Sequence, residues 1–189
     1  MYYFHNLNKK LNMKNITLLI ISLFFIGCAQ NNEEYNQLKA DKEYVESNVK
    51  MYSDVWNAVF SEKNIDLVTS ENFHEDVTVV TSNGDVTGLE NFKGYYANYL
   101  NGFSDGEFTI VHIFSQGDML VKQWHFKGTH DGDFFGIPAT NKQLDLTGTT
   151  IVKMKDGKVL QEQDFFPSSL AFLCIGFLAQ VLTESISFQ

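Results

Sequence analysis

The hydrophobic pattern of this chain changes its period at Gly102. Between Asp41 and Gly102, apolar residues recur every three or four positions, the spacing of one face of a helix. After Gly102, apolar and polar residues alternate, which is typical of strands with one buried face. Helices followed by a run of strands predict an α+β domain, in which a strongly curved antiparallel sheet wraps around the helices. Such a sheet leaves a pocket between itself and the helices.

Three helices and a hairpin are expected between residues 41 and 102. Aspartate is a favourable N-cap, so the first helix is expected to begin at Asp41. Its apolar face includes Tyr52 and Trp56, and the helix is expected to end near Asn64. The sequence Ser-Asn-Gly-Asp at 82–85 is typical of a tight turn. The other expected elements are helices 65–71 and 89–102 and paired strands 77–81 and 86–87.

Four strands are expected after Gly102, separated by turns or loops at 115–118, 131–141 and 155–157. Every second side chain of a strand points to the same face. The predicted faces are Phe108, Ile110, His112 and Phe114 on the first strand, Leu120, Trp124, Phe126 and His130 on the second, and Leu160, Glu162 and Asp164 on the last. If these faces are the concave ones, the pocket contains aromatic rings, one or two imidazoles and a carboxylate.

These groups form a general acid–base set without a nucleophile. Desolvation in apolar surroundings makes a carboxyl group a usable acid or base near neutral pH, which makes Asp164 the first catalytic candidate. His130 and His112 are its candidate partners. Each has a structural alternative: Asp164 as a surface acid at a strand end, His112 as a hydrogen-bonded core histidine, and His130 as a solvated imidazole. The candidate ligand-binding residues are Trp56, Tyr96, Phe108, Trp124 and Phe126.

Several other functions are excluded by composition and motifs. The formal net charge is −9, and all 14 cationic side chains are lysines, so the chain lacks the basic surface and the guanidinium groups that nucleic acids favour. The sequence has no metal-binding motif, no glycine-rich phosphate loop and no nucleophile elbow. We therefore expect neither a metal nor a cofactor.

The N-terminus is typical of a bacterial export signal. Lys14 precedes an apolar stretch at 16–26, which is shorter than the about 20 residues needed to span a bilayer. The alternative is a buried core element. Gly27-Cys28 resembles a lipobox, whose cysteine is lipidated and becomes the mature first residue. The expected location is therefore the bacterial cell envelope, with a lipid anchor at Cys28. The expected organisation is a signal peptide 1–27, of which 1–12 is an upstream extension, a flexible tether 28–40 and a domain 41–189.

The stretch from Trp124 to Val159 carries a longer motif. It reads WHFKGTHDGDFFGIPATNKQLDLTGTTIVKMKDGKV and fits the pattern G-x-H-x-G-x-(F/L)-x-G-(I/V)-P-P-T-G-K followed by D-G-K, with Ala139 and Asn141 replacing the second proline and the glycine. This pattern resembles that of the SnoaL-like polyketide cyclase or ester cyclase family, within the nuclear transport factor 2-like superfamily.

The resemblance implies a cone-shaped α+β barrel with an apolar pocket, often dimeric through its sheet. The family's cyclases close a ring by intramolecular aldol condensation without a cofactor, using an acidic residue and a histidine or polar partner. By position, Asp164 falls on that acid and His130 on the histidine of the motif. Many relatives carry a second aspartate and a Gln-Leu-Gly sequence where this chain has Pro167 and Cys174-Ile175-Gly176.

Two functional hypotheses follow. In the first, the protein is an ester cyclase-type enzyme that acts on a small apolar carbonyl compound by cofactor-free acid–base chemistry. In the second, it is an envelope lipoprotein that binds a small apolar ligand without converting it. The partners expected in either case are that ligand, the membrane through the lipid anchor, and a second copy of the chain as a homodimer.

Overall fold

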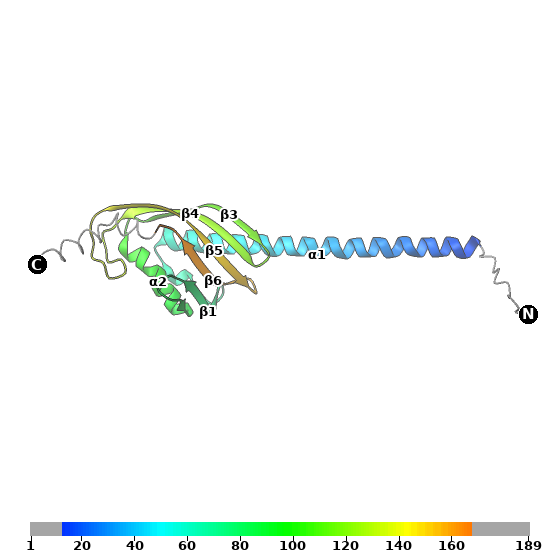
Figure 1. The fold of residues 1–189 in the computed structure, drawn as a ribbon, viewed down its shortest axis with the longest axis horizontal. Helices are drawn as coiled ribbons and strands as arrows, with labels where there is room; N and C mark the ends of the chain where they lie inside the picture. The colour runs from blue at the N-terminus through cyan, green and yellow to red at the C-terminus, as the bar shows by residue number, and fades with distance from the viewer. Residues whose placement is uncertain (1–12, 168–189) are drawn as a thin grey trace, which may run out of the picture. The chain divides into compact units, whose positions relative to one another are not determined.

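The structure is a computed structural model that describes residues 13–167, with side chains described from Asn32 onward. The described part consists of two α-helices, a 3-10 turn and six strands (Figure 1). In chain order these are α1 (Met13–Glu62), η1 (Ile65–Leu67), β1 (Phe73–Val80), β2 (Val86–Thr87), α2 (Leu89–Gly102), β3 (Glu107–Gln116), β4 (Met119–Thr129), β5 (Gln143–Lys155) and β6 (Lys158–Phe165). The strands form one curved, open sheet in the order β2-β1-β6-β5-β4-β3. The expected α+β architecture is confirmed.

Two features of the helices and the sheet differ from the expectation. The sheet is mixed, because β1 and β6 run parallel while the other neighbours are antiparallel. The expected helix 65–71 is only the short turn η1, because the backbone is already extended at Val68 and β1 begins at Phe73. Helix α2 has the expected bounds, and the predicted hairpin is confirmed by the pairing of Thr78 with Thr87 and of Val79 with Val86.

Helix α1 crosses the boundary between two compact units, residues 1–43 and 44–189. Residues 28–40, expected as a flexible tether, are helical. Residues 31–43 contain neither proline nor glycine, and pairs four residues apart support the helix: Gln37 donates to Asp41 at 2.7 Å, and Lys39 lies 3.7 Å from Glu43. The backbone of Cys28 lies in α1, but its side chain is outside the described ones, as are residues 1–12 and Cys174. Within the described residues we find no helix that could cross a bilayer.

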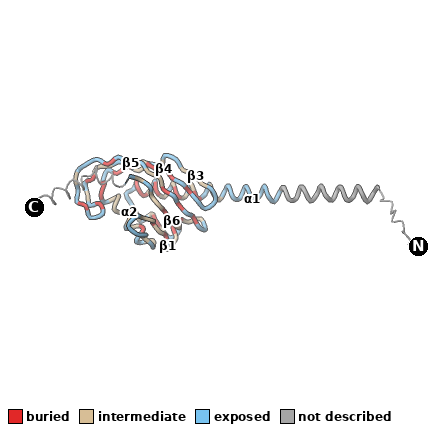
Figure 2. The backbone as a smooth tube through the Cα atoms, viewed as in Figure 1, coloured by how far each residue is buried: buried red, intermediate tan, exposed pale blue. Residues whose placement is uncertain are grey.

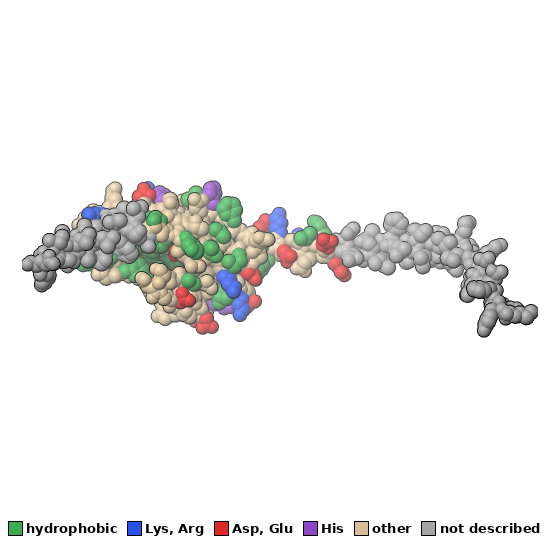
Figure 3. Space-filling model, in the orientation of Figure 1, with side chains coloured by type: hydrophobic (Ala, Val, Ile, Leu, Met, Phe, Trp, Pro, Cys, Tyr) green, Lys and Arg blue, Asp and Glu red, His purple; other side chains and the backbone are tan. Residues whose placement is uncertain are grey.

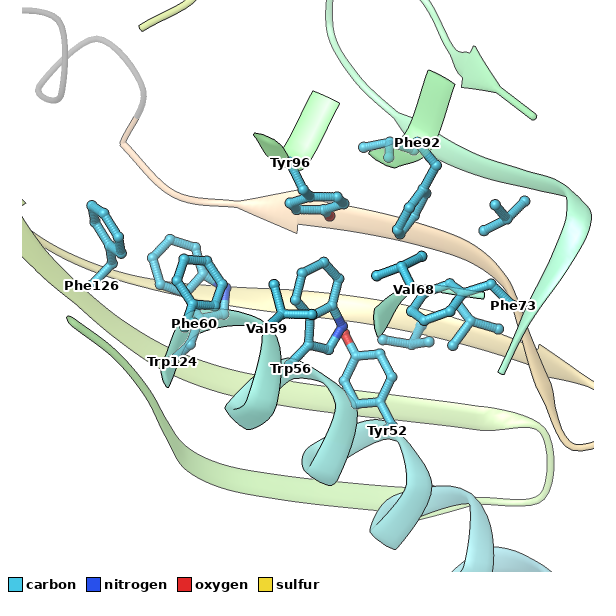
Figure 4. Close-up of a cluster of buried hydrophobic side chains, with 14 of the residues drawn as sticks. Tyr52, Trp56, Val59, Phe60, Val68, Phe73, Phe92, Tyr96, Trp124 and Phe126 are labelled. Carbon is cyan, nitrogen blue, oxygen red and sulfur yellow. The ribbon is translucent and has the colours of Figure 1, made fainter. Parts of the chain in front are cut away.

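The core of the second unit is formed by the buried segments in Figure 2, and its side chains are mainly aromatic (Figure 4). Tyr52, Trp56 and Phe60 project from α1 toward Tyr96 of α2. The Trp56 ring lies at the centre of this cluster, with centroid distances of 4.6 Å to Tyr96 and 6.5 Å to Tyr52. Trp56 is 1% exposed and Tyr52 is fully buried. Burial of side chains of this size supplies much of the free energy of folding.

Tight turns set the register of the two long hairpins. Asp156 and Gly157 form the two-residue connection between β5 and β6, and both have positive φ, at 51° and 75°. This geometry matches the twist of the flanking strands, which explains the Asp-Gly sequence there. The predicted turns at 115–118 and 155–157 are therefore confirmed.

Register shifts in two strands change the predicted faces. In β3, a shift between Ile110 and His112 interrupts the alternation, so His112 and Phe114 are exposed while Ile113 turns inward. The prediction that His112 shares a face with Phe108 and Ile110 is therefore wrong. In the β5–β6 pair, a similar shift pairs Met154 with Val159, so Val159 takes the buried position predicted for Leu160. Glu162 remains buried and Asp164 half-buried, as the alternation predicts.

Candidate functional site

A small cavity of about 30 Å³ lies between α1, α2 and the sheet. We call it the inner cavity. It is lined by Trp56, Phe60, Tyr96, Tyr99, Phe108, Lys122, Trp124, Phe126 and Asp164. All five aromatic residues predicted to contact a ligand are in this lining. A volume of this size holds one or two water molecules, or the end of a larger ligand.

A larger pocket of about 630 Å³ adjoins the inner cavity. We call it the outer pocket. It is lined by Val80, Thr81, Ser82, Asn83, Tyr95, Tyr99, Phe134, Phe135, Leu144, Leu146, Gln163, Asp164, Phe165 and Phe166. Figure 3 shows hydrophobic side chains between α2 and the sheet on the face turned to the viewer. Tyr99 and Asp164 line both spaces, so they mark the junction between them. The outer pocket falls in the size range of sites for small organic ligands.

Asp164 is held in position at this junction by two hydroxyl groups. Thr150 Oγ1 donates to Asp164 Oδ1, and the Tyr96 hydroxyl lies 3.1 Å from Asp164 Oδ2. Thr150 is fully buried and accepts a hydrogen bond of 3.0 Å from Trp124 Nε1. Each oxygen of the Asp164 carboxylate therefore has a hydroxyl donor. Asp164 is therefore a fixed, half-buried acceptor that faces an apolar space.

Glu162 lies on the same face of β6 and is fully buried. Its Oε1 accepts a hydrogen bond of 3.1 Å from Trp56 Nε1, and its Oε2 lies 2.8 Å from the Tyr96 hydroxyl. Burial raises the pKa of Glu162, and the charge of Lys122 opposes this shift. Burial therefore favours the protonated form of Glu162.

The Tyr96 hydroxyl connects the two acids. It contacts both Glu162 and Asp164, but it has only one proton to donate. It donates this proton to Glu162 Oε2 at 2.8 Å and shares it with Asp164 Oδ2 at 3.1 Å. Burial raises the pKa of Tyr96 as well, which keeps its hydroxyl protonated. The Tyr96 hydroxyl therefore links Glu162 and Asp164 through one shared proton.

Lys122 is a further ionisable side chain near the inner cavity, after Asp164 and Glu162. Its side chain is 3% exposed, and Nζ lies about 5 Å from the ring centroids of Tyr52, Trp56 and Phe108. Burial lowers the pKa of Lys122, while Glu162 and Asp164 oppose the shift. Aromatic faces attract a cation, so the three rings stabilise the ammonium.

His130 holds the loop of its own motif in place. It is fully buried, its backbone N–H donates to Lys142 O, and its carbonyl accepts from the N–H groups of Thr140 and Asn141. Its Nδ1 lies 3.0 Å from Thr140 Oγ1. Burial lowers the pKa of His130, which favours the neutral ring. The motif residues thus fix the 130–142 loop, and His130 is absent from the linings of both spaces.

The structure therefore brings together only part of the predicted site. Asp164 lies beside the five aromatic residues, whereas His130 and the exposed His112 lie elsewhere. Sequence reasoning did not assign a role to Lys122 or Tyr99. Lys122 could have been found from the alternation of β4, because it lies between Leu120 and Trp124 on the buried face. Within the described residues, no group of three His, Cys, Asp or Glu side chains could hold a metal ion.

The raised pKa of Glu162 predicts that this residue makes the fold less stable as the pH increases. The folded state holds the Glu162 proton more tightly than the unfolded state, whose glutamate pKa is about 4.3. The stabilisation is complete below that value and is lost as the pH rises through the folded-state pKa. Glu162→Gln is expected to remove this loss, so its free energy of unfolding relative to wild type increases as the pH rises above about 4. Urea titrations measure the difference, and a difference independent of pH would contradict the prediction.

Comparisons with known proteins agree with this architecture. A model of the SnoaL-like polyketide cyclase family matches residues 47–168. That range covers more than half of the chain and includes the whole sheet and α2, and the chain belongs to this family. No curated protein sequence matches the chain.

Solved structures show the same fold at low sequence identity. A candidate SnoaL-like polyketide cyclase from Jannaschia sp. CCS1 is 22% identical with a TM-score of 0.64, and the match covers 69% of this chain and 92% of the other. TsrD from Streptomyces laurentii is 19% identical with a TM-score of 0.61, over 68% of this chain and 95% of the other. An NTF2-like protein of unknown function from Burkholderia pseudomallei K96243 is 12% identical with a TM-score of 0.57, over 69% and 98%. These likenesses establish the NTF2-like fold.

Proposed function

We propose that the protein binds an apolar carbonyl compound in the outer pocket and removes a proton from the carbon next to the carbonyl group, with Asp164 as the base. The observation that carries this proposal is the position of Asp164, which lines both the largely apolar outer pocket and the inner cavity. Two hydroxyl donors hold its carboxylate oxygens. Membership of a family named for polyketide cyclases favours a carbonyl substrate.

The chemistry needs no cofactor. An aldol ring closure or an isomerisation begins when a base takes a proton from a carbon beside a carbonyl group. A positioned carboxylate in a site shielded from water is sufficient for this step if a donor stabilises the enolate oxygen. Asp164 can accept the proton because its oxygens have lone pairs beyond those used by Thr150 and Tyr96.

The test is hydrogen–deuterium exchange of 2-tetralone, an apolar bicyclic ketone, by the full-length chain in D₂O. Wild-type protein is expected to accelerate deuterium incorporation beside the carbonyl above the buffer rate. 2-Naphthol, a planar analogue of the enol, is expected to inhibit this exchange competitively. Binding of 2-naphthol without any exchange would contradict the proposal and favour the non-catalytic alternative, a small-molecule-binding protein.

The location of the protein is a separate part of the proposal. The apolar stretch 16–26 and Gly27-Cys28 support a lipid anchor at Cys28 in the bacterial cell envelope. Cys28→Ser is expected to abolish incorporation of labelled palmitate and to move the protein from the membrane fraction to the soluble fraction. Cys174→Ser is the matched control and should leave both unchanged. A Cys28→Ser protein that remains in the membrane fraction would contradict the anchor.

A further inference from the structure

Lys122 is the buried lysine among the side chains that the structure describes. It lies on the inner face of β4, between Leu120 and Trp124, and lines the inner cavity together with Asp164. Burial of a lysine ammonium costs free energy unless other groups compensate it. Such a residue in a largely aromatic core therefore requires an explanation.

The surroundings of Lys122 attract its charge but leave its donors unused. The rings of Tyr52, Trp56 and Phe108 lie 5.0, 5.1 and 5.1 Å from Nζ. Among the described residues, no oxygen accepts a hydrogen bond from Nζ, and no carboxylate lies within ion-pair distance. An ammonium group has three N–H donors, and aromatic faces do not replace an oxygen acceptor. The donors therefore remain available to a group that enters the inner cavity.

We propose that Lys122 is the oxyanion partner of Asp164, so that its ammonium binds the carbonyl oxygen of the ligand in the inner cavity while Asp164 takes the neighbouring proton. This inference rests on the proposed function and names its electrophilic group. Lys122 takes the role that the sequence suggested for His130 or His112.

The sizes of the two spaces define the ligand class. The inner cavity of about 30 Å³ admits a carbonyl group but not a ring, whereas the outer pocket of about 630 Å³ accommodates a ring system. Asp164 and Tyr99 line both spaces. The ligand is therefore an apolar cyclic ketone, or its enol, with its oxygen at Lys122, the carbon next to the carbonyl group at Asp164 and its rings in the outer pocket.

The proton transfer is balanced within this pair. The C–H proton moves to an Asp164 oxygen, and the electron pair of that bond becomes the carbon–carbon double bond of an enolate. The negative charge moves from Asp164 to the ligand oxygen, where the Lys122 ammonium faces it. The net charge of the site is unchanged, which avoids creating an unpaired charge in an apolar interior.

The test measures the ionisation of bound 2-naphthol, whose oxygen is equivalent to the enolate oxygen. A cation close to this oxygen favours the naphtholate, which is identified by its absorption spectrum. The pKa of bound 2-naphthol is expected to be lower in wild type than in Lys122→Met by about one unit or more, so that about tenfold more ligand is ionised at a given pH. The other titratable groups around the site are Glu162, Asp164, Tyr52, Tyr95, Tyr96 and Tyr99, and all remain in the variant.

Matched variants separate this effect from a change in folding. Lys153→Met removes an exposed lysine of β5 and should leave the spectrum of bound 2-naphthol as in wild type. Lys122→Gln retains a donor without the charge and should give an intermediate ionised fraction. If neither Lys122 variant folds, the contact is tested in wild type by NMR. The ¹⁵N chemical shift of the Lys122 ammonium should change on addition of 2-naphthol.

The two proposals fail in different experiments. Equal naphthol ionisation in folded wild type and Lys122→Met, or an unchanged Lys122 ammonium signal on ligand binding, would overturn the role of Lys122. Absence of 2-tetralone exchange by wild type would overturn the proposed reaction, whatever the ionisation of bound naphthol.

Discussion

Asp164→Asn is expected to lower the rate constant for deuterium exchange into 2-tetralone by about 10²- to 10⁴-fold, the usual contribution of a positioned general base. The amide of asparagine cannot accept the proton. Its oxygen can still accept the hydrogen bond from Thr150, and Tyr96 can still donate to Glu162. The fold should therefore be retained, and the loss should appear in the exchange rate and not in the folded content measured by circular dichroism.

The control for this variant is Asp54→Asn on the exposed face of α1. Asp54 pairs only with Lys50 among the described residues, and an exposed pair of this kind contributes little to stability. Asp54→Asn should exchange 2-tetralone at the wild-type rate. An Asp164→Asn protein that exchanges 2-tetralone at half the wild-type rate or faster would show that another group is the base.

Gly148→Ala is expected to reduce the free energy of unfolding by about 2–3 kcal/mol, because it overpacks the wall of the inner cavity. A Cβ atom at Gly148 would lie 2.3 Å from Trp124 Cζ2 and 2.7 Å from two other atoms of that ring. The indole would have to move, and the hydrogen bond from Trp124 to Thr150 would be strained. Urea denaturation measures the loss, and the melting temperature should fall by several degrees.

Gly94→Ala is expected to have the opposite effect on the free energy of unfolding. Gly94 is exposed on α2, and an added Cβ would have no heavy atom within 4 Å. Alanine in a helix interior is more favourable than glycine by about 0.5–1 kcal/mol, so Gly94→Ala should be slightly more stable than wild type. A Gly148→Ala protein as stable as Gly94→Ala would show that Trp124 does not pack against β5 as described.

Local patterns predicted the elements of this fold better than their pairing. The bounds of α2 and the hairpin turn at Asp156-Gly157 follow from apolar periodicity and turn chemistry, which depend on neighbouring residues. The parallel pairing of β1 with β6 joins segments about 80 residues apart, and no local signal specifies it. The sheet was therefore predicted as wholly antiparallel.

The candidate site was predicted in part for a similar reason. Alternation put Trp124, Phe126 and Asp164 on the face of the sheet where the structure has them, but the register shift in β3 moved His112 to the outer face. The family motif drew attention to His130, which the structure shows to fix a loop. Lys122 was overlooked because lysine is almost never fully buried, although its position in β4 matched the inner face.

The position of a bound ligand tests the central claim most directly. In a crystal structure of the full-length chain with 2-naphthol, we expect the rings in the outer pocket, the oxygen within hydrogen-bonding distance of Lys122 Nζ, and the carbon next to the C–O group facing an Asp164 oxygen. A ligand bound only on the outer face of the sheet, or one whose oxygen points away from Lys122 toward solvent, would contradict the account.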